Sequence, residues 1–226
     1  GKLLNIIPFV SPYNSFMVTP NHPVLAIKRE LMEKSRKSSS KCDWLRINKK
    51  ELSSTDPYYV DAYNLSIGDY LIFSTLNPSE DNSALSKDYL NLLGYYLSEV
   101  YFSAKGSIVA FAFNKNEKEN INELKTLIFK ATGKNAKMRI RKSVAEVYVC
   151  SRKLVKSLQE HGGRLARNKR MSEKIMKLPP KKQWAIFLTY FKGDGNKYKR
   201  RNKDSETYRM DTTSETLAVQ MQQILA

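Results

Sequence analysis

One pattern occurs twice in this chain and limits the folds it can adopt. Residues 92–99 have the sequence LLGYYLSE, and residues 187–195 have the sequence FLTYFKGDG. Each stretch is largely apolar, carries two small residues four positions apart, and then presents one acid, Glu99 or Asp194. Residues four apart share one face of a helix, so each helix would offer a flat stripe to a partner. We expect the two helices to pack along these stripes with their acids side by side.

Two acids at adjacent helix ends indicate a metal site. Helix C-termini carry partial negative charge, so bare carboxylates there repel each other, and a bound divalent cation relieves the repulsion. Mg²⁺ suits Glu99 and Asp194 because it needs only one or two protein carboxylates and keeps water for its other ligands. The alternative is a pair of core helices that happen to end in an acid, one of them with a glycine C-cap.

The sequence after each pattern also runs in parallel, which favours a duplication over coincidence. A hairpin-like stretch follows at 101–113 and at 197–213, and an amphipathic helix follows at 121–132 and at 214–225. The first copy continues through a second hairpin, 139–141 with 144–150, into a helix capped by Ser151. The second copy has no such continuation, so we expect either a missing complementary segment or a fragment of a longer chain.

The charge balance predicts a polyanionic partner. The formal net charge is +17, and residues 164–203 contain fourteen lysines and arginines against two acids. A solvated basic surface without a partner is the alternative.

No apolar run is long enough to cross a bilayer and no signal pattern opens the chain, so we expect an intracellular protein, in cytoplasm or nucleoid, that is not secreted and has no membrane partner. Cys42 and Cys150 are expected to be reduced and structural.

The composition changes near residue 80, which predicts two domains. Residues 1–80 are expected to form a partial all-β segment, and residues 81–226 an α+β domain with a first repeat at 87–163 and an incomplete second repeat at 164–226. The strands expected in the first domain lie at 16–18, 44–47, 59–60 and 70–73.

The paired motifs resemble the LAGLIDADG homing endonucleases of the intein-encoded, dodecapeptide type. The resemblance implies an αββαββα repeat pair, truncated in the second repeat, that packs its motif helices together, lays its sheets over double-stranded DNA and binds catalytic metal with Glu99 and Asp194. Residues 168–172, with the sequence NKRMS, are similar to the family segment that supplies a basic catalytic residue, which places that role on Lys169. An ordinary surface lysine is the alternative for Lys169. Val100 and Thr189 stand where the family has glycine.

Within this resemblance, hairpin strands would enter the major groove of DNA. The expected DNA contacts are basic residues on the strands of both repeats: Arg139, Arg141, Lys142, Lys197, Lys199, Arg200, Arg201 and Arg209.

The N-terminal part is similar to the Hint (protein-splicing) domain of inteins. Residues 18–26, with the sequence VTPNHPVLA, resemble the splicing segment in which Thr19 and His22 polarise the scissile amide. A proline-flanked turn with an exposed histidine is the alternative. Because Gly1 and Ala226 are not the nucleophile and asparagine that splicing needs, we do not expect this chain to splice itself.

Three functions are therefore predicted. The first is a site-specific, Mg²⁺-dependent endonuclease of intein origin that cuts double-stranded DNA. The second is a catalytically inactive DNA-binding remnant, and the third is a fragment of a protein-splicing intein.

Overall fold

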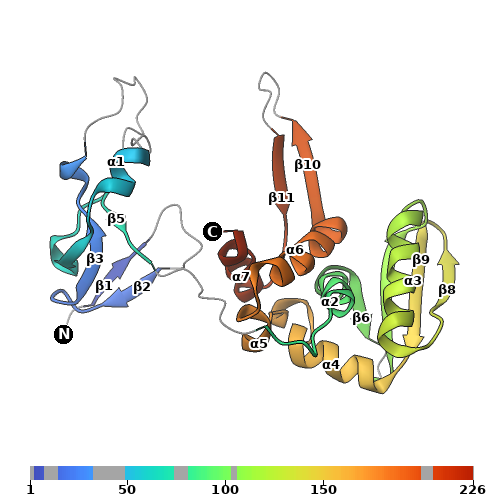
Figure 1. Cartoon of the computed structure of the whole chain (residues 1–226). Coiled ribbons are helices and arrows are strands. Elements are labelled where there is room, and N and C mark those ends of the chain that lie inside the picture. The colour runs from blue at the N-terminus through green and yellow to red at the C-terminus, as the bar shows by residue number, and fades with distance from the viewer. Residues whose placement is uncertain are drawn as a thin grey trace. The chain divides into compact units, whose positions relative to one another are not determined.

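The computed structural model describes residues 3–7, 15–32, 49–73, 81–102, 106–199 and 206–225. The chain divides into two units, Gly1–Thr75 and Leu76–Ala226, and both combine helices with small sheets (Figure 1). In these described ranges, no helix has both the length and the apolar composition required to cross a membrane.

The first unit holds two small antiparallel sheets. One sheet pairs β1 (Leu4–Ile6) with β2 (Phe16–Val18), and the other places β3 (Pro23–Ile27) between β4 (Tyr58–Asp61) and β5 (Tyr70–Leu71). A short helix α1 (Lys49–Ser54) and two 3-10 turns, Arg29–Leu31 and Ala62–Asn64, complete it. The strands predicted at 16–18, 59–60 and 70–73 fall on β2, β4 and β5, and the strand predicted at 44–47 lies outside the described residues.

The second unit begins with α2 and runs through two similar sets of elements. In the first set, α2 (Lys87–Glu99) leads to β6 (Val100–Phe102), β7 (Ile108–Asn114), α3 (Lys118–Thr132), β8 (Lys137–Arg141), β9 (Val144–Cys150) and α4 (Arg152–Gly162). A 3-10 turn, Ala166–Asn168, and α5 (Glu173–Met176) follow. The second set is α6 (Pro180–Asp194), β10 (Gly195–Lys199), β11 (Glu206–Met210) and α7 (Glu215–Leu225).

Local sequence signals set the helix ends in this unit. The Ser86 and Ser151 hydroxyls accept hydrogen bonds from the backbone N–H groups of Tyr89 and Leu154, which caps α2 and α4. Gly133 ends α3 with a φ of 68°, a left-handed conformation that glycine adopts without a Cβ penalty. The elements predicted after each motif therefore lie close to their expected positions.

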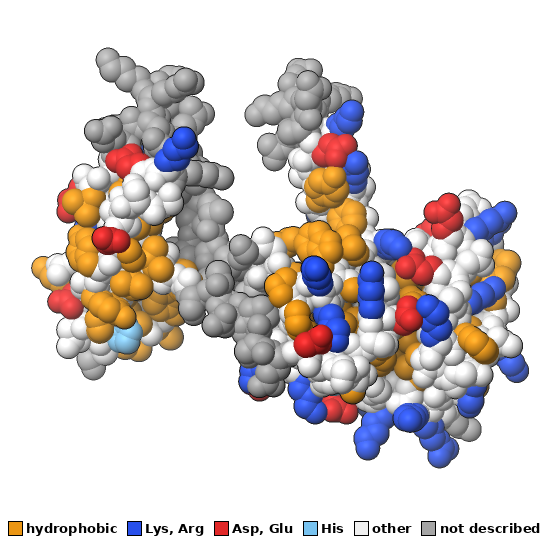
Figure 2. Space-filling model, viewed as in Figure 1, with side chains coloured by type: hydrophobic (Ala, Val, Ile, Leu, Met, Phe, Trp, Pro, Cys, Tyr) orange, Lys and Arg blue, Asp and Glu red, His pale blue; other side chains and the backbone are white. Residues whose placement is uncertain are grey.

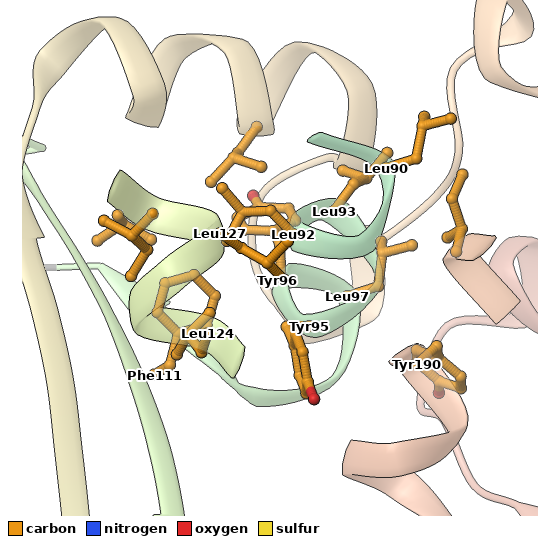
Figure 3. Packing of buried hydrophobic residues seen from close by; sticks show 14 of the residues in the cluster. Leu90, Leu92, Leu93, Tyr95, Tyr96, Leu97, Phe111, Leu124, Leu127 and Tyr190 are labelled. Atoms are coloured by element: carbon orange, nitrogen blue, oxygen red, sulfur yellow. The ribbon is translucent and has the colours of Figure 1, made fainter. Parts of the chain in front are cut away.

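Helix α2 is the centre of the core of the second unit. Leu90, Leu93 and Tyr95 are fully buried, and Figure 3 shows them with Phe111 of β7 and Leu124 of α3. The sheet beneath is antiparallel with strand order β6-β7-β9-β8, and β10 pairs with β11 in a separate hairpin. Because α2 is buried on nearly every side, its C-terminal end is held firmly, and that end carries the first predicted acid.

Candidate metal centre and nucleic-acid interface

Helices α2 and α6 pack against each other through the small residues that the sequence repeats. A Cβ added to Gly94 would collide with the Thr189 hydroxyl and lie 2.5 Å from the Ile186 carbonyl oxygen. A Cβ added to Gly193 would lie 2.6 Å from Ser98 Cβ and 3.1 Å from Glu99 Cγ. Gly94 meets Thr189, and Ser98, four residues later, meets Gly193, which is four residues after Thr189. The helices are therefore parallel, and their C-terminal ends meet.

Thr189 and Val100, which stand where the LAGLIDADG sequences that the motifs resemble have glycine, are both accommodated by this geometry. Thr189 is buried opposite Gly94, and its hydroxyl donates to the Ala185 and Ile186 carbonyls at 3.1 and 3.2 Å. Val100 ends α2 with φ −94° and ψ 144°, and Gly195 ends α6 with φ −91° and ψ 146°. This extended conformation is open to any residue, so the valine leaves the turn after Glu99 matched to the turn after Asp194.

Both motif acids hold their protons more tightly than usual. Burial raises the pKa of Glu99 to about 7, with further contributions from the charges of Asp194 and Glu117, and Lys169 opposes the shift. Partial burial also raises the pKa of Asp194, while Lys169 and a hydrogen bond from Tyr190 act against it. Carboxyl groups that resist ionisation at a shared position are a recognised mark of functional sites.

The side chain of Lys169, which lies between α4 and α6, extends to the C-terminal end of α2, where Glu99 lies. Its ammonium group donates to the Leu97 carbonyl at 2.6 Å and to the Ser98 carbonyl at 3.1 Å, which are among the last carbonyls of α2. Burial lowers its pKa, and the charges of Asp194 and Glu99 act in the opposite direction. The structure thus brings together the three residues predicted as one site, namely Glu99, Asp194 and Lys169.

Two neighbours of this site were not predicted from the sequence. Tyr190 lies one helical turn before Asp194 and donates to the Asp211 carbonyl at 3.1 Å. Its spacing of four residues from Asp194 is a signal that could have identified it. Glu117, just before α3, raises the pKa of Glu99 through its charge, and no local sequence pattern predicts this electrostatic interaction between residues 18 positions apart.

The residues present suit a hard, hydrated cation better than a closed metal cage. In the described part of the chain, no group of three or more His, Cys, Asp or Glu side chains is placed to hold a metal ion. Glu99 and Asp194 supply two oxygen donors, which matches the small number of protein ligands that Mg²⁺ requires. Binding would favour the ionised form of both carboxyls and offset the burial that now raises their pKa values.

Three of the predicted DNA contacts are engaged within the protein. Arg139 makes a two-pronged ion pair with the buried Glu146. Lys197 pairs with Glu206 at 2.8 Å, and Arg209 pairs with Asp211 at 3.0 Å. These cations would have to exchange an internal carboxylate for a phosphate, which reduces their net contribution to DNA binding.

Three other predicted contacts are exposed to solvent. Arg141 and Lys142 lie at the tight turn between β8 and β9, where Lys142 has a φ of 52°, and Lys199 lies at the end of β10. In the residues that the structure describes, their side chains have no ion pair. Figure 2 shows lysine and arginine side chains spread over much of the second unit. Arg200 and Arg201 lie outside the described residues.

The residues predicted from the splicing resemblance lie in the first unit. Thr19 and His22 bracket a tight turn between β2 and β3, in which the His22 N–H donates to the Thr19 carbonyl at 3.0 Å. Both residues are exposed. The Ala62 N–H donates to the His22 carbonyl at 2.9 Å, so the backbone of the turn is fixed while the imidazole faces solvent.

No model of a known protein family matches the chain. Two relatives, from Mycobacterium tuberculosis and Mycobacterium bovis, are called iron-sulfur cluster assembly SufBD family proteins. Each is 29% identical over 231 residues, a match that takes in 100% of this chain and 27% of the relative. The chain therefore spans about a quarter of the length of these relatives.

Shorter parts of the chain are similar to the DNA polymerases of two Thermococcus strains. The polymerase of Thermococcus litoralis is 32% identical over 155 residues, which are 65% of this chain and 8% of the polymerase. The polymerase of Thermococcus sp. is 32% identical over 139 residues, which are 59% of this chain and 8% of the polymerase.

These comparisons correct the function predicted from the sequence. The relatives that match the whole chain are named for iron–sulfur cluster assembly, and neither DNA hydrolysis nor protein splicing appears in their names. The prediction of a homing endonuclease, with its intein-splicing alternative, is therefore wrong. Double-stranded DNA as a partner and Mg²⁺ as a bound cation stay predictions.

Proposed function

We propose that the second unit is a binding module that holds one divalent cation between Glu99 and Asp194 and binds double-stranded DNA beside it. The observation that supports this most is the parallel α2–α6 seam, which brings two acids with raised pKa values to one end of a rigid helix pair. The proposal concerns binding, and it assigns no cleavage of DNA.

The bound cation would supply positive charge where the protein now has two crowded acids. A hydrated Mg²⁺ on Glu99 and Asp194 can meet a phosphate oxygen through its remaining ligand positions. Lys169 adds a second positive charge close by, although its ammonium group is already directed at carbonyls of α2. Exposed cations such as Arg141 and Lys142 would contact more distant phosphates and set the orientation of the duplex.

The relatives support a module that is carried within longer proteins. The whole chain corresponds to 27% of the SufBD family proteins, and 65% of it corresponds to 8% of the Thermococcus litoralis polymerase; these two groups have unrelated names. We propose that its architecture derives from an intein-encoded LAGLIDADG element with a partial Hint-like segment before it. This proposal concerns ancestry and fold, and it rests on the paired motif helices.

The cation site can be tested by titrating the full chain with Mn²⁺ and following free Mn²⁺ by electron paramagnetic resonance at pH 8. We expect one site per chain, weakened at least about tenfold by Glu99→Gln or Asp194→Asn because each change removes a ligand. Glu119→Gln, at an exposed position of α3, is the matched control and should bind as the unchanged protein does. Equal affinity in all four proteins would exclude this site.

The DNA interface can be tested by fluorescence anisotropy with a labelled duplex at several salt concentrations. Each phosphate contact contributes about −0.9 to the slope of log K against log salt. We expect the double change Arg141→Gln with Lys142→Gln to make the slope shallower by about 2. Lys118→Gln with Lys153→Gln removes the same charge from exposed helix positions and should leave the slope almost unchanged. Identical slopes in both double variants would contradict the assignment.

The similarity of the whole chain to about a quarter of the SufBD family proteins favours a second candidate, a part in iron–sulfur cluster assembly as a segment of a longer protein. The chain has two cysteines, and Cys150 is exposed, whereas protein-bound clusters commonly need four thiolates. Any cluster would therefore depend on ligands outside this chain. Anaerobic reconstitution of a longer relative, with and without the matching segment, tests this: a loss of visible cluster absorbance on deletion would support it, and unchanged absorbance would refute it.

A further inference from the structure

A basic pocket lies between the C-terminal end of α4 and the N-terminal end of α7. Its volume is about 380 Å³, and its lining includes Arg164, Arg167, Lys169 and Arg170. A glutamine, an asparagine and a threonine complete the polar side chains, and no carboxylate is among the described residues that line it. We call it the arginine pocket.

The three guanidinium groups of the arginine pocket are available for a ligand. In the part of the chain that the structure describes, the Arg164, Arg167 and Arg170 side chains take part in no ion pair or hydrogen bond. The three residues are exposed. Like charges gathered in one concave place repel each other, so the arrangement is stabilised when an anion binds there.

The loop that carries these arginines has a strained backbone. Leu165 has φ 68° and ψ 150°, a combination that L residues rarely adopt, and its side chain is 68% exposed. Such strain costs on the order of 1–3 kcal/mol and is found mainly at functional sites. An exposed leucine gains little from burial, so the conformation must be imposed by the contacts on either side.

Those contacts hold the loop at both ends. On one side, the Tyr96 hydroxyl donates to the Gly163 carbonyl, and the Arg170 N–H donates to the Gly162 carbonyl at 3.1 Å. Gly163 has a φ of 75°, and an added Cβ would collide with the Asn168 carbonyl, so only glycine fits. The loop is thus closed tightly onto the end of α4.

Helix α7 holds the other end of the loop. The Ser214 hydroxyl donates to the Lys169 carbonyl at 2.5 Å. The Gln220 side chain bonds the Met171 backbone twice, accepting from its N–H at 2.7 Å and donating to its carbonyl at 2.8 Å. The arginines therefore project from a backbone that is fixed before any ligand arrives, which lowers the entropic cost of binding.

We propose that the arginine pocket binds a phosphate group. Arginine presents a planar fork of N–H donors that matches the oxygens of phosphate, and three such forks around a pocket without acids favour a dianion. Lys169 adds charge, but its ammonium is held on α2, so the arginines make the direct contacts. The phosphate can come from the end of a nucleic-acid strand or from a small phosphate ester. This site goes beyond the proposed cation and duplex binding, and it would stand if either failed.

The test is a titration of the full chain with inorganic phosphate at pH 8 and low salt, without divalent cations, followed by calorimetry. We expect saturable binding of one phosphate per chain. Arg167→Gln and Arg170→Gln should each weaken it about tenfold, because each removes hydrogen bonds to a charged ligand. Arg152→Gln at the opposite end of α4 removes the same charge and should leave the affinity unchanged. Absence of saturable binding, or equal weakening by Arg152→Gln, would overturn the proposal.

Two duplexes then distinguish the sources of the phosphate. One carries 5′-phosphates and the other 5′-hydroxyls, and both are measured against the unchanged chain and the Arg167→Gln variant. Tighter binding of the phosphorylated duplex that is lost in the variant supports the pocket and assigns it a strand end. Equal binding of both duplexes, together with pocket-dependent binding of inorganic phosphate, supports the pocket and assigns it a small phosphate ester.

Discussion

Glu99 shows how the surroundings of one side chain decide its chemistry. Its carboxyl lies at the C-terminal end of the largely buried helix α2, and burial of the carboxyl, reinforced by the charges of Asp194 and Glu117, raises its pKa to about 7. Asp194 is more open to solvent and shows a shift in the same direction. The pair therefore stores an unfavourable charge interaction at neutral pH, which is the condition that a bound cation relieves.

This interaction makes stability depend on pH at a single residue. The pKa of Glu99 rises from 4.5 to about 7 on folding, so the folded state binds the proton more tightly. The resulting stability is complete below pH 4.5 and is lost as the pH rises through 7. We predict that Glu99→Gln, which cannot ionise, is more stable than the unchanged protein at pH 8 by about 2 kcal/mol and differs little from it at pH 5.

Urea unfolding followed by circular dichroism at both pH values measures this difference. Glu119→Gln serves as the control, since Glu119 is an exposed acid on α3. Mg²⁺ added at pH 8 should stabilise the unchanged protein and have little effect on Glu99→Gln. The prediction would be contradicted if the stability of Glu99→Gln, measured against the unchanged protein, were lower at pH 8 than at pH 5.

Single residues also show where sequence reasoning succeeds and fails. The repeat predicted that Glu99 and Asp194 meet, and the family resemblance alone placed Lys169 beside them. The internal pairing of Arg139 with Glu146 was not predicted, since it depends on which residues face each other across β8 and β9. A list of basic residues gives the net charge of a surface but not which cations are already neutralised.

At the scale of elements, the α2–α6 seam determines the position of the acids. Its close approach depends on Gly94 and Gly193, because each lies against a polar side chain of the partner helix, Thr189 or Ser98. The hydroxyls of both side chains turn back onto carbonyls of their own helix. The seam is therefore a close backbone contact with no hydrogen bond across it among the described atoms.

We predict that Gly94→Ala destabilises the protein. In an ordinary helix, alanine is favoured over glycine by about 1 kcal/mol. A decrease in the free energy of unfolding would therefore reveal the clash of the new methyl group with Thr189 and the Ile186 carbonyl. Overpacking of this kind costs about 3 kcal/mol where backbone atoms cannot move aside. Denaturant unfolding measures the effect, and Asn122→Ala, at an exposed position on α3, should stay within about 0.5 kcal/mol of the unchanged protein.

A second change makes the test specific to the seam. Thr189→Gly removes one of the two obstacles, so the double variant Gly94→Ala with Thr189→Gly should be less destabilised than the sum of the single changes. If the destabilisation of the double variant equalled the sum of the two single changes, Gly94 and Thr189 would not be in contact as described.

The elements themselves could be predicted to very different degrees. Helices α2 and α6 were predicted because their small residues and terminal acids repeat at the same spacing within short stretches. Strand β3 and helix α1 were not predicted as such, because proline and polar residues weaken their local patterns. The arginine pocket required contacts such as Gln220 with Met171, which are 49 residues apart and leave no periodic signal.

At the scale of the whole molecule, the two units have separate cores. In Gly1–Thr75 the buried residues include Ala26 and Ile27 of β3, whereas in Leu76–Ala226 they centre on α2. Each unit also has one tryptophan, Trp44 in the first and Trp184 in the second. Fluorescence of Trp184 on α6 can therefore follow the second unit once Trp44 is replaced by phenylalanine, and hydrogen exchange of the β3 amides can follow the first unit.

We predict that the two units unfold independently. Leu124 is fully buried on α3, so Leu124→Ala should lower the stability of the second unit by about 2–5 kcal/mol, seen as an earlier unfolding transition of Trp184. The protection of the β3 amides should not change, because every described residue of the core cluster that contains Leu124 belongs to the second unit. Ile27→Ala is the reciprocal change: Ile27 is 2% exposed in the first unit, so its truncation should lower only the protection of the β3 amides. If either variant changed both the Trp184 transition and the protection of the β3 amides, the two units would unfold as one cooperative body. The stability effects predicted for Glu99→Gln and Gly94→Ala would then be measured on the whole chain and not on the second unit alone.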